Sequence, residues 1–428
     1  MSAKNGGAAA DWVSYARAYE IVLEHCRRLG SEIVPIDRLL GRALAQEIRS
    51  RVSHPPWNSS AMDGFAVRAE DLGNATPQAP VSLPLSGESP AGAEPPGPLR
   101  HGSAVKVMTG APVPEGASGV VRIEHTDGGR RGRVTFFRTD DANRNIRRAG
   151  EDIRRGDLLL GLGDTLTPAA IGALALTGQA EARVGRVPQV GVLASGDELV
   201  DMDARDAVLA GRKIMNTNSV SLAAQVRSAG ADPLLLGIAR DEPSDLRDRL
   251  RRLDECDALI TAGGVSVGER DYVKPVLEEM GMRRLFWRVR IRPGSALLFG
   301  VANGRPIWGV PGNPVSAMVT FELFVRPALR KLAGHARFER SRSFVRSLVE
   351  LNTPTEVRCF YRAILRESTD DLPGAELTGP QGSGNLMSMV DADGLLVVPE
   401  GIGRVEPGMI LPFIRLRSWR AAGSGEAE

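Results

Sequence analysis

Apolar and polar positions follow a repeating pattern between residues 188 and 334. Short apolar runs such as VGVLA (190–194) and ALIT (258–261) alternate with helical patterns such as NSVSLAAQVRSAG (218–230). Buried strands that alternate with amphipathic helices are typical of βαβ units, in which the strands run parallel. We therefore predict an α/β region with a mostly parallel sheet over this part of the chain.

The segments that precede this region have a different character. Residues 12–29 and 37–50 place apolar side chains at helical spacing, and residues 167–179 do so again. Between them, residues 51–148 carry short alternating runs, which are typical of β-strands. We predict an α-rich element into which a small β-rich segment is inserted.

Two stretches are harder to assign from pattern alone. Seven prolines stand between Thr76 and Arg100, and this composition is compatible both with a β-rich segment and with a disordered linker. From residue 343 onward, short apolar runs are punctuated by glycine and helix signals are few. This second pattern predicts a small C-terminal β-barrel or sandwich.

Composition narrows the class of protein. A chain of 428 residues exceeds what one hydrophobic core supports, and 42% hydrophobic and 25% charged residues with a net charge of +2 indicate a globular protein without a nucleic-acid partner. We see no signal-peptide core and no membrane-spanning apolar run, so we expect a cytoplasmic protein without a membrane partner. Three scattered cysteines and five histidines argue against a zinc site or a disulfide framework.

The segment TAGGVSVGERDY (261–272) predicts the end of a strand, a glycine-rich loop and the start of a helix. Small residues in such a loop let backbone N–H groups converge on an anion, which the helix N-terminus also favours. These residues are Gly263, Gly264, Ser266 and Gly268. Asp271 follows at the mouth of the loop, where a carboxylate beside an anion requires a cation between them. We predict a divalent metal together with a phosphorylated ligand.

Ligands of open parallel sheets bind beyond the carboxyl ends of the strands, and four predicted strand ends here carry polar residues or rigid turns. Besides the glycine loop, these are Ser195, Gly196, Asp197 and Glu198 after 190–194, Asp241 after 234–239, and Pro311, Gly312, Asn313, Pro314 and Ser316 after 307–310. Glu198 and Asp241, each taken alone, also suit a helix N-cap or first turn. The three hard oxygen donors Glu198, Asp241 and Asp271, without Cys or His nearby, favour magnesium.

Arginines supply positive charge near these three acids. Arg288 and Arg292 are spaced to share one face of a strand within FWRVRIRPGS (286–295), from which they can clamp an oxyanion. A solvated basic edge strand is the alternative.

The run from Gly264 to Gly268 also matches the nucleophile elbow of hydrolases. Only His335 follows it in the chain, so a base that could activate the serine is missing.

Seven motifs in the same order resemble the MoeA family of molybdopterin molybdenumtransferases, which is related to the E domain of gephyrin. They are PPWNSSAMDGFAVR (55–68), VKVMTGAPVPEG (105–116), NIRRAGEDI (145–153), SGDEL (195–199), TAGGVSVGERDY (261–272), GVPGNPVSA (309–317) and QGSGNLMSMVDADGLLVVPEG (381–401). The resemblance implies four domains and a homodimer in which the β domain of one subunit completes the cleft of the other. The domains are an elongated α-rich domain (11–50 and 149–187), an inserted β domain (51–148), a MoaB/MogA-like α/β molybdopterin-binding domain (188–335) and a C-terminal β-barrel (343–420).

The resemblance also implies a reaction. Adenylylated molybdopterin is cleaved with Mg²⁺ to release AMP, and molybdenum from molybdate is inserted, in molybdenum cofactor biosynthesis. By the same resemblance, Asp63 and Thr109 are active-site positions of the β domain, Glu198, Asp241 and Asp271 are cleft acids, and Ser266 and the PGNP segment bind the pterin phosphate. A molybdopterin adenylyltransferase and acceptor molybdoenzymes are the implied partners. A diverged paralogue that carries molybdopterin without catalysis is the alternative, but the intact acids favour the enzyme.

One departure from the family pattern concerns its lysines. Where members typically read W-K-x-x-I-K-P-G-K-P, this chain has Arg288, Arg292 and Ser295 in place of the three lysines. Arginine keeps the charge but does not give up its proton, so it can serve as a fixed cation and not in proton transfer. Loss of the third cation should weaken attraction for a doubly charged oxyanion, and the choice between molybdate and tungstate stays open.

Overall fold

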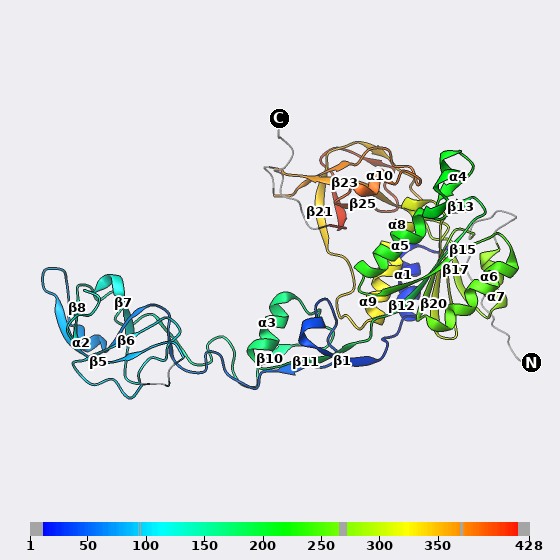
Figure 1. The fold of residues 1–428 in the computed structure, drawn as a ribbon. Helices are drawn as coiled ribbons and strands as arrows, with labels where there is room; N and C mark the ends of the chain where they lie inside the picture. The colour runs from blue at the N-terminus through cyan, green and yellow to red at the C-terminus, as the bar shows by residue number, and fades with distance from the viewer. Residues whose placement is uncertain (1–11, 93, 95, 265–271, 369–370, 418–428) are drawn as a thin grey trace, which may run out of the picture. The chain divides into compact units, whose positions relative to one another are not determined.

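The structure of the protein is a computed structural model that describes residues 12–92, 94, 96–264, 272–368 and 371–417 (Figure 1). The chain forms two compact units. The larger unit comprises Met1–Gln46, Leu162–Ile171 and Ala180–Glu428, and the smaller unit comprises Glu47–Gly161 and Gly172–Gln179. The division into four domains stays a prediction beside these two units. None of the helices described is long and apolar enough to cross a membrane.

The larger unit is built around a six-stranded sheet with strand order β15-β12-β16-β20-β19-β17. The strands are β12 (Gln189–Ser195), β15 (Asp232–Ala239), β16 (Ala258–Ala262), β17 (Arg283–Trp287), β19 (Leu298–Ala302) and β20 (Arg305–Val310). The first four strands in this order pair in parallel, and β19 and β17 add an antiparallel edge. The predicted α/β region with a mostly parallel sheet is confirmed.

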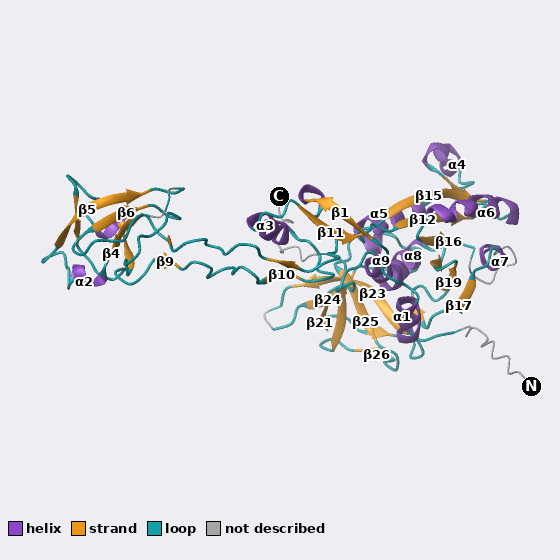
Figure 2. Ribbon diagram, turned by 90° about the horizontal axis from the view of Figure 1, so that it is seen from below, coloured by secondary structure: helices purple, strands orange, loops and turns teal. Residues whose placement is uncertain are grey.

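Both faces of this sheet are buried. Neighbouring residues of one strand point to opposite faces, and Val192 and Leu193 on β12 accordingly belong to two different core clusters, as do Ile260 and Leu259 on β16. The helices are α5 (Thr217–Ser228), α6 (Pro243–Leu250), α7 (Val273–Glu279), α8 (Pro314–Thr320) and α9 (Arg326–Leu332). Helices α5, α8 and α9 pack together on the first cluster, whereas α6 and α7 supply the second (Figure 2). Continuous apolar strands are what burial on both faces requires.

The N-terminal part of the larger unit begins with α1 (Tyr15–Glu24), which is capped by the side chain of Ser14 and buries its apolar face in the first core cluster. Strand β1 (Ser31–Pro35) then pairs antiparallel with β11 (Glu181–Gly185). The predicted helix over residues 167–179 is confirmed as α3 (Pro168–Leu176), which belongs to the larger unit up to Ile171 and to the smaller unit from Gly172.

The helix expected over residues 37–50 is wrong. This stretch forms a 3-10 turn, Ile36–Arg38, and the short strand β2 (Ile48–Arg49). Its apolar residues Ala43 and Leu44 are buried one by one in bridges to other parts of the chain. Gly41, at φ +76°, adopts a left-handed conformation that interrupts a helix.

The smaller unit holds a five-stranded sheet with strand order β7-β4-β6-β5-β8. The strands are β4 (Gly64–Val67), β5 (Val81–Ser89), β6 (Ala104–Val107), β7 (Gly119–Arg122) and β8 (Arg133–Phe136). Phe65, Val121 and Phe136 are fully buried in its core. The predicted β-rich insertion is confirmed, and β5 lies inside the proline-rich stretch, so the disordered-linker interpretation is wrong for that part.

The C-terminal part of the chain closes into a five-stranded barrel. Its strands are β21 (Arg342–Ser347), β23 (Arg358–Arg366), β24 (Gly374–Leu377), β25 (Gly394–Val398) and β27 (Ile410–Arg415). Strand β23 pairs with both β24 and β25, which returns the sheet to its starting strand and confirms the predicted barrel. A further short strand, β18 (Ile291–Arg292), comes from the α/β part of the chain and pairs in parallel with β23.

Candidate active-site cleft

A cleft of about 1210 Å³ lies in the larger unit at the carboxyl ends of β12, β16 and β20. The structure brings many of the predicted residues from separate loops to its walls. They are Ser195, Gly196, Glu198, Asp241, Gly263, Gly264, Arg292, Pro311, Gly312, Asn313, Pro314 and Ser316. Asp197 and Arg288 do not line this cleft. Ser266, Gly268 and Asp271 lie outside the described residues, so the glycine loop is described only at its beginning.

The ends of three strands approach one another closely at the floor of the cleft. Gly263, which follows β16, has φ +89°, and a Cβ atom built on it would lie 2.5 Å from the carbonyl oxygen of Ser195 on β12. Its N–H donates to the carbonyl oxygen of Val310 on β20, at 3.2 Å. Only glycine combines this backbone conformation with such an approach, so Gly263 determines how tightly the strand ends converge.

Hydrogen bonds orient the acidic side of the cleft. The hydroxyl of Ser195 donates to Asp241 Oδ1 at 3.1 Å, and the N–H of Asp197 donates to Asp241 Oδ2 at 3.4 Å. Asp241 N–H in turn donates to Asp197 Oδ1 at 3.3 Å. Asp197 therefore acts on the cleft by holding Asp241. Lys213 Nζ donates to the carbonyl oxygen of Asp197 and fixes that loop further.

Two of the three predicted metal ligands lie on this side of the cleft. The carboxylate of Glu198 packs against Gly196, where an added Cβ would lie 2.6 Å from Oε1. Together with Asp241 it offers hard oxygen donors of the kind that Mg²⁺ prefers. Within the described residues no cluster of three His, Cys, Asp or Glu side chains is placed to hold a metal ion, and the third predicted ligand, Asp271, is not described.

The arginine segment differs from its prediction. The single strand expected to present Arg288 and Arg292 on one face is wrong, because β17 ends at Trp287 and β18 begins only at Ile291. Arg288 between them has φ +74°, and its guanidinium carbon lies 4.5 Å from the ring centre of Trp287. Pairing with the distant Val13 causes the break, since Val13 N–H donates to Arg288 O at 3.1 Å. Arg292 alone of this pair lines the cleft.

Sequence reasoning missed a wall contributed by the barrel. Gln381, Gly382 and Ser383 line the cleft, and Ser383 is bound to the PGNP segment, since its Oγ accepts from Asn313 Nδ2 at 3.0 Å. The QGSGN motif carries these residues, but nothing local in it indicates which part of the fold it meets.

The missed wall is held by a buried guanidinium. Arg362 on β23 is 1% exposed, and it donates from Nε to Ser388 Oγ at 3.0 Å and from Nη2 to the carbonyl oxygen of Gly382 at 3.1 Å. The backbone N–H of Arg362 also donates to Gln381 Oε1 at 2.9 Å. Burial lowers the pKa of Arg362 to about 10, which still leaves it charged at neutral pH. Arg362 therefore positions the loop that carries Gln381 and Gly382.

Asn218, at the start of α5, is another cleft residue that the sequence did not single out. Its Nδ2 donates to the carbonyl oxygen of Gly312 at 2.7 Å, which ties α5 to the loop after β20. Asn216 caps the same helix by accepting from Ser219 N–H at 3.1 Å. The N-x-N spacing at a helix start is the signal that could have indicated a cap, but not its proximity to the cleft.

Asp63 and Thr109 lie together in the smaller unit. Asp63 precedes β4, Thr109 follows β6, and the register of Gly64 with Val107 places both at one end of the sheet. Asp63 Oδ1 accepts from the N–H of Thr109 at 2.7 Å and from its hydroxyl at 2.8 Å. These hydrogen bonds, the backbone one first, hold the pKa of Asp63 below its ordinary value. The pair keeps an exposed carboxylate ionised and fixed in direction.

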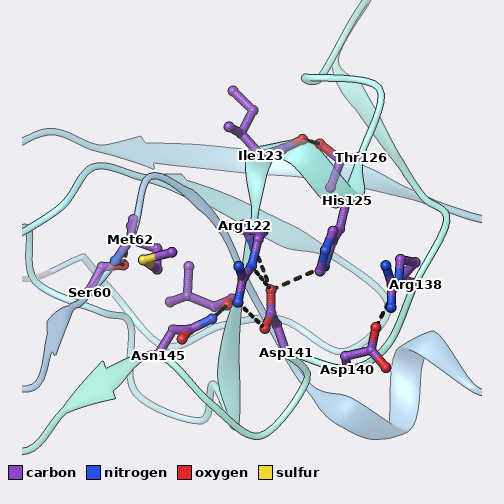
Figure 3. Close-up of polar contacts among 11 residues, drawn as sticks. Ser60, Met62, Arg122, Ile123, His125, Thr126, Arg138, Asp140, Asp141 and Asn145 are labelled. Atoms are coloured by element: carbon purple, nitrogen blue, oxygen red, sulfur yellow. Dashed lines mark hydrogen bonds and ion pairs between the residues drawn. The ribbon is translucent and has the colours of Figure 1, made fainter.

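A charged cluster supports the same end of that sheet (Figure 3). Arg122 at the end of β7 pairs with the buried Asp141 through Nε to Oδ2 at 2.7 Å and Nη2 to Oδ1 at 3.1 Å. His125 Nδ1 lies 3.2 Å from the same Oδ2. The bidentate pair with Arg122 lowers the pKa of Asp141. Since Gly64 is in register with Arg122, this cluster anchors the strand next to Asp63.

Comparison with known proteins covers nearly the whole chain. The MoeA N-terminal region (domain I and II) matches residues 13–178, a probable molybdopterin binding domain matches 191–331, and the MoeA C-terminal region (domain IV) matches 345–416. The chain is similar to molybdopterin molybdenumtransferase 2 of Mycobacterium tuberculosis H37Rv, with 37% identity over 91% of this chain and 96% of that protein.

A second relative and a solved structure agree with these family matches. The molybdopterin molybdenumtransferase of Nostoc sp. is 35% identical over 90% of this chain and 89% of its own length. Among solved structures, the molybdopterin biosynthesis moeA protein from Pyrococcus horikoshii OT3 has a TM-score of 0.79 and 26% identity over 94% of this chain and 100% of its own. The resemblance that the seven motifs indicated is thereby confirmed, and the chain belongs to the MoeA family.

Proposed function

We propose that the protein is a molybdopterin molybdenumtransferase of molybdenum cofactor biosynthesis. Two relatives that match nearly the full chain bear that name, at 37% and 35% identity. The observation that carries the proposal is the convergence of Ser195, Asp241, Gly263 and the PGNP segment in one cleft of the matched molybdopterin-binding domain. Small and polar strand ends of this kind suit a phosphorylated ligand.

We propose adenylylated molybdopterin and molybdate as the substrates, with Mg²⁺ held by Glu198 and Asp241 and by the undescribed Asp271. When bound, Mg²⁺ would offset the charge of the phosphates and stabilise AMP as it leaves. Ser195 donates to Asp241 and so keeps one carboxylate oxygen turned in a fixed direction. Arg292 faces the cleft as a permanent cation, which attracts and orients an oxyanion but does not transfer its proton.

The protein is further proposed to be a homodimer in which Asp63 and Thr109 of one subunit serve the cleft of the other. The hydrogen bonds that keep Asp63 ionised and directed support a role in charge placement rather than in acid catalysis. The proposed place of action is the cytoplasm, with a molybdopterin adenylyltransferase upstream and acceptor molybdoenzymes downstream.

A second candidate function follows from the altered lysine positions. Arg288 does not line the cleft, and Ser295 stands in the cleft where the family pattern has a lysine. With a single arginine of this segment facing the cleft, the cleft attracts an oxyanion less strongly than the three lysines of the family pattern would. A carrier that binds molybdopterin without turnover would tolerate this loss.

The deciding experiment is cofactor synthesis with purified protein, adenylylated molybdopterin, Mg²⁺ and either molybdate or tungstate, with AMP release as the readout. We expect AMP release that depends on Mg²⁺ and falls at least a hundred-fold in Glu198→Gln, because a metal contact contributes several kcal/mol in the transition state. Asp232→Asn, an exposed acid at the opposite end of β15, is the matched control and should keep the wild-type rate. Tight binding of molybdopterin without AMP release would instead identify a carrier.

A further inference from the structure

A second cavity, of about 260 Å³, lies in the larger unit, and none of the described residues lines both this cavity and the cleft. Its walls come from residues 40–43, from Thr165, from the end of β11 and the chain just after it, and from the C-terminal ends of α5 and α9. Its basic lining residues are Arg42, Arg227, Arg330 and His335. Among the residues that the structure describes, none of those lining this cavity is an acid. The cavity is therefore basic.

Arg330 is half-buried in this cavity and its partners are neutral. Its Nη2 donates to Thr165 Oγ1 at 3.2 Å and to His335 Nδ1 at 3.1 Å. His335 is only 3% exposed, and burial together with Arg330 and Arg326 lowers its pKa to about 3, so it carries no charge at neutral pH. Burial and the nearby Arg340 also lower the pKa of Arg330. Among the residues that the structure describes, no carboxylate pairs with Arg330, and a half-buried guanidinium in this situation favours an anion beside it.

The other two arginines differ in how far they are neutralised. Arg42 already has an acidic partner, since its Nη2 lies 2.5 Å from Glu32 Oε1 and donates to the carbonyl oxygen of Gly185 at 2.7 Å. Arg227 is exposed at the last turn of α5, and its side chain has no partner among the described residues. The excess positive charge of the cavity therefore comes from Arg227 and Arg330.

Helix ends offer an ordinary explanation for such arginines, because cations at a C-terminus offset exposed carbonyl groups. Here the backbone already occupies those carbonyls. At the end of α5, Ala231 N–H donates to Val226 O at 3.1 Å, and at the end of α9, His335 N–H donates to Arg330 O at 3.0 Å. Both are Schellman-type closures, which leave these carbonyls no need of a side-chain donor. Helix capping thus does not explain why Arg330 is half-buried.

We propose that this cavity binds a small tetrahedral oxyanion, of the class of phosphate and molybdate, between Arg227 and Arg330. A volume of about 260 Å³ is below the roughly 300–1,000 Å³ typical of sites for larger organic ligands, so a small ion suits it. Guanidinium groups bind such oxyanions through paired N–H donors, which Arg227 and Arg330 supply from two sides of the cavity lining.

The proposal is tested by isothermal titration of the full-length protein with inorganic phosphate and, separately, with molybdate. All proteins carry Arg292→Gln, which removes the arginine that lines the described part of the cleft and hence its contribution to anion binding. We expect saturable binding that weakens at least ten-fold in Arg227→Gln and in Arg330→Gln, because each removes a charge-assisted contact. Arg251→Gln, whose side chain is 79% exposed, is the matched control and should bind like its parent.

Arg227 is exposed, so its substitution keeps the fold and the result stays interpretable if Arg330→Gln misfolds. Absence of saturable phosphate and molybdate binding, or equal binding by Arg227→Gln and Arg251→Gln, would overturn the proposal. Arg227 lines the cavity and not the described part of the cleft, so Arg227→Gln in the otherwise unaltered chain should release AMP at the wild-type rate. Failure of the proposed transferase activity would therefore leave this inference to be judged on binding alone.

Discussion

Replacement of Gly263 by alanine tests whether close approach of the strand ends builds the cleft. Gly263 has φ +89°, and the new Cβ would lie 2.5 Å from the carbonyl oxygen of Ser195. The left-handed backbone costs a residue with a side chain about 1–2 kcal/mol, and the overpacked contact adds about 1–3 kcal/mol. We therefore expect Gly263→Ala to lower the free energy of unfolding by about 2–5 kcal/mol.

Thermal unfolding followed by circular dichroism measures this effect. For a domain of this size each kcal/mol corresponds to roughly 2–4 °C, so the melting temperature should fall by about 4–20 °C. Gly312→Ala is the matched control, because Gly312 lines the same cleft, and among the described residues an added Cβ would meet only Gly263 Cα, at 3.7 Å. Its melting temperature should stay within about 2 °C of wild type. Equal melting temperatures for the two variants would refute the reasoning about the floor of the cleft.

Three further predictions concern charge in the proposed active site. Arg292→Ala should raise the molybdate concentration for half-maximal AMP release about ten-fold, and Ser295→Lys should lower it, because the first removes and the second adds a cation; an unchanged dependence on molybdate would contradict the clamp. Thr109→Val removes a hydrogen bond that lowers the pKa of Asp63, so the acid limb of the pH–rate profile should move to higher pH, and an unmoved limb would argue against a required Asp63 carboxylate. Mixed subunits carrying Asp63→Asn and Asp271→Asn should recover about a quarter of wild-type activity after random exchange, and no recovery despite verified exchange would rule out action across the dimer.

The layers of the fold could be predicted because their signals are local. Strands buried on both faces must be continuously apolar, as residues 190–194 and 258–261 are, and the parallel sheet followed from that pattern. The helix over 37–50 was a wrong prediction for the opposite reason. Its apolar spacing is real, but Ala43 and Leu44 are buried through bridges to Thr165 and Val184, which no local pattern reveals.

In the candidate site, too, the residues that depend on local pattern and topology could be predicted, and those that depend on long-range pairing could not. Ser195, Asp241 and the PGNP segment could be placed in one cleft because topology alone brings the carboxyl ends of parallel strands together. Arg288 could not be placed, because residue spacing assumes a continuous strand and pairing with Val13 breaks it. The loop at 381–383 was missed since its position depends on how the barrel packs, which is a long-range property of the chain.

Strand β23 links two parts of the cleft that are far apart in sequence. Its first residues pair with β18, which presents Arg292, and farther along it Arg362 fastens the loop at Gly382. The barrel thus supports one wall of the cleft. Local unfolding of β23 would disorder that wall while the α/β sheet stays folded. A ligand that spans the cleft would in turn be expected to slow amide hydrogen exchange along β23, so the barrel serves as a reporter of occupancy for a site formed largely by another sheet.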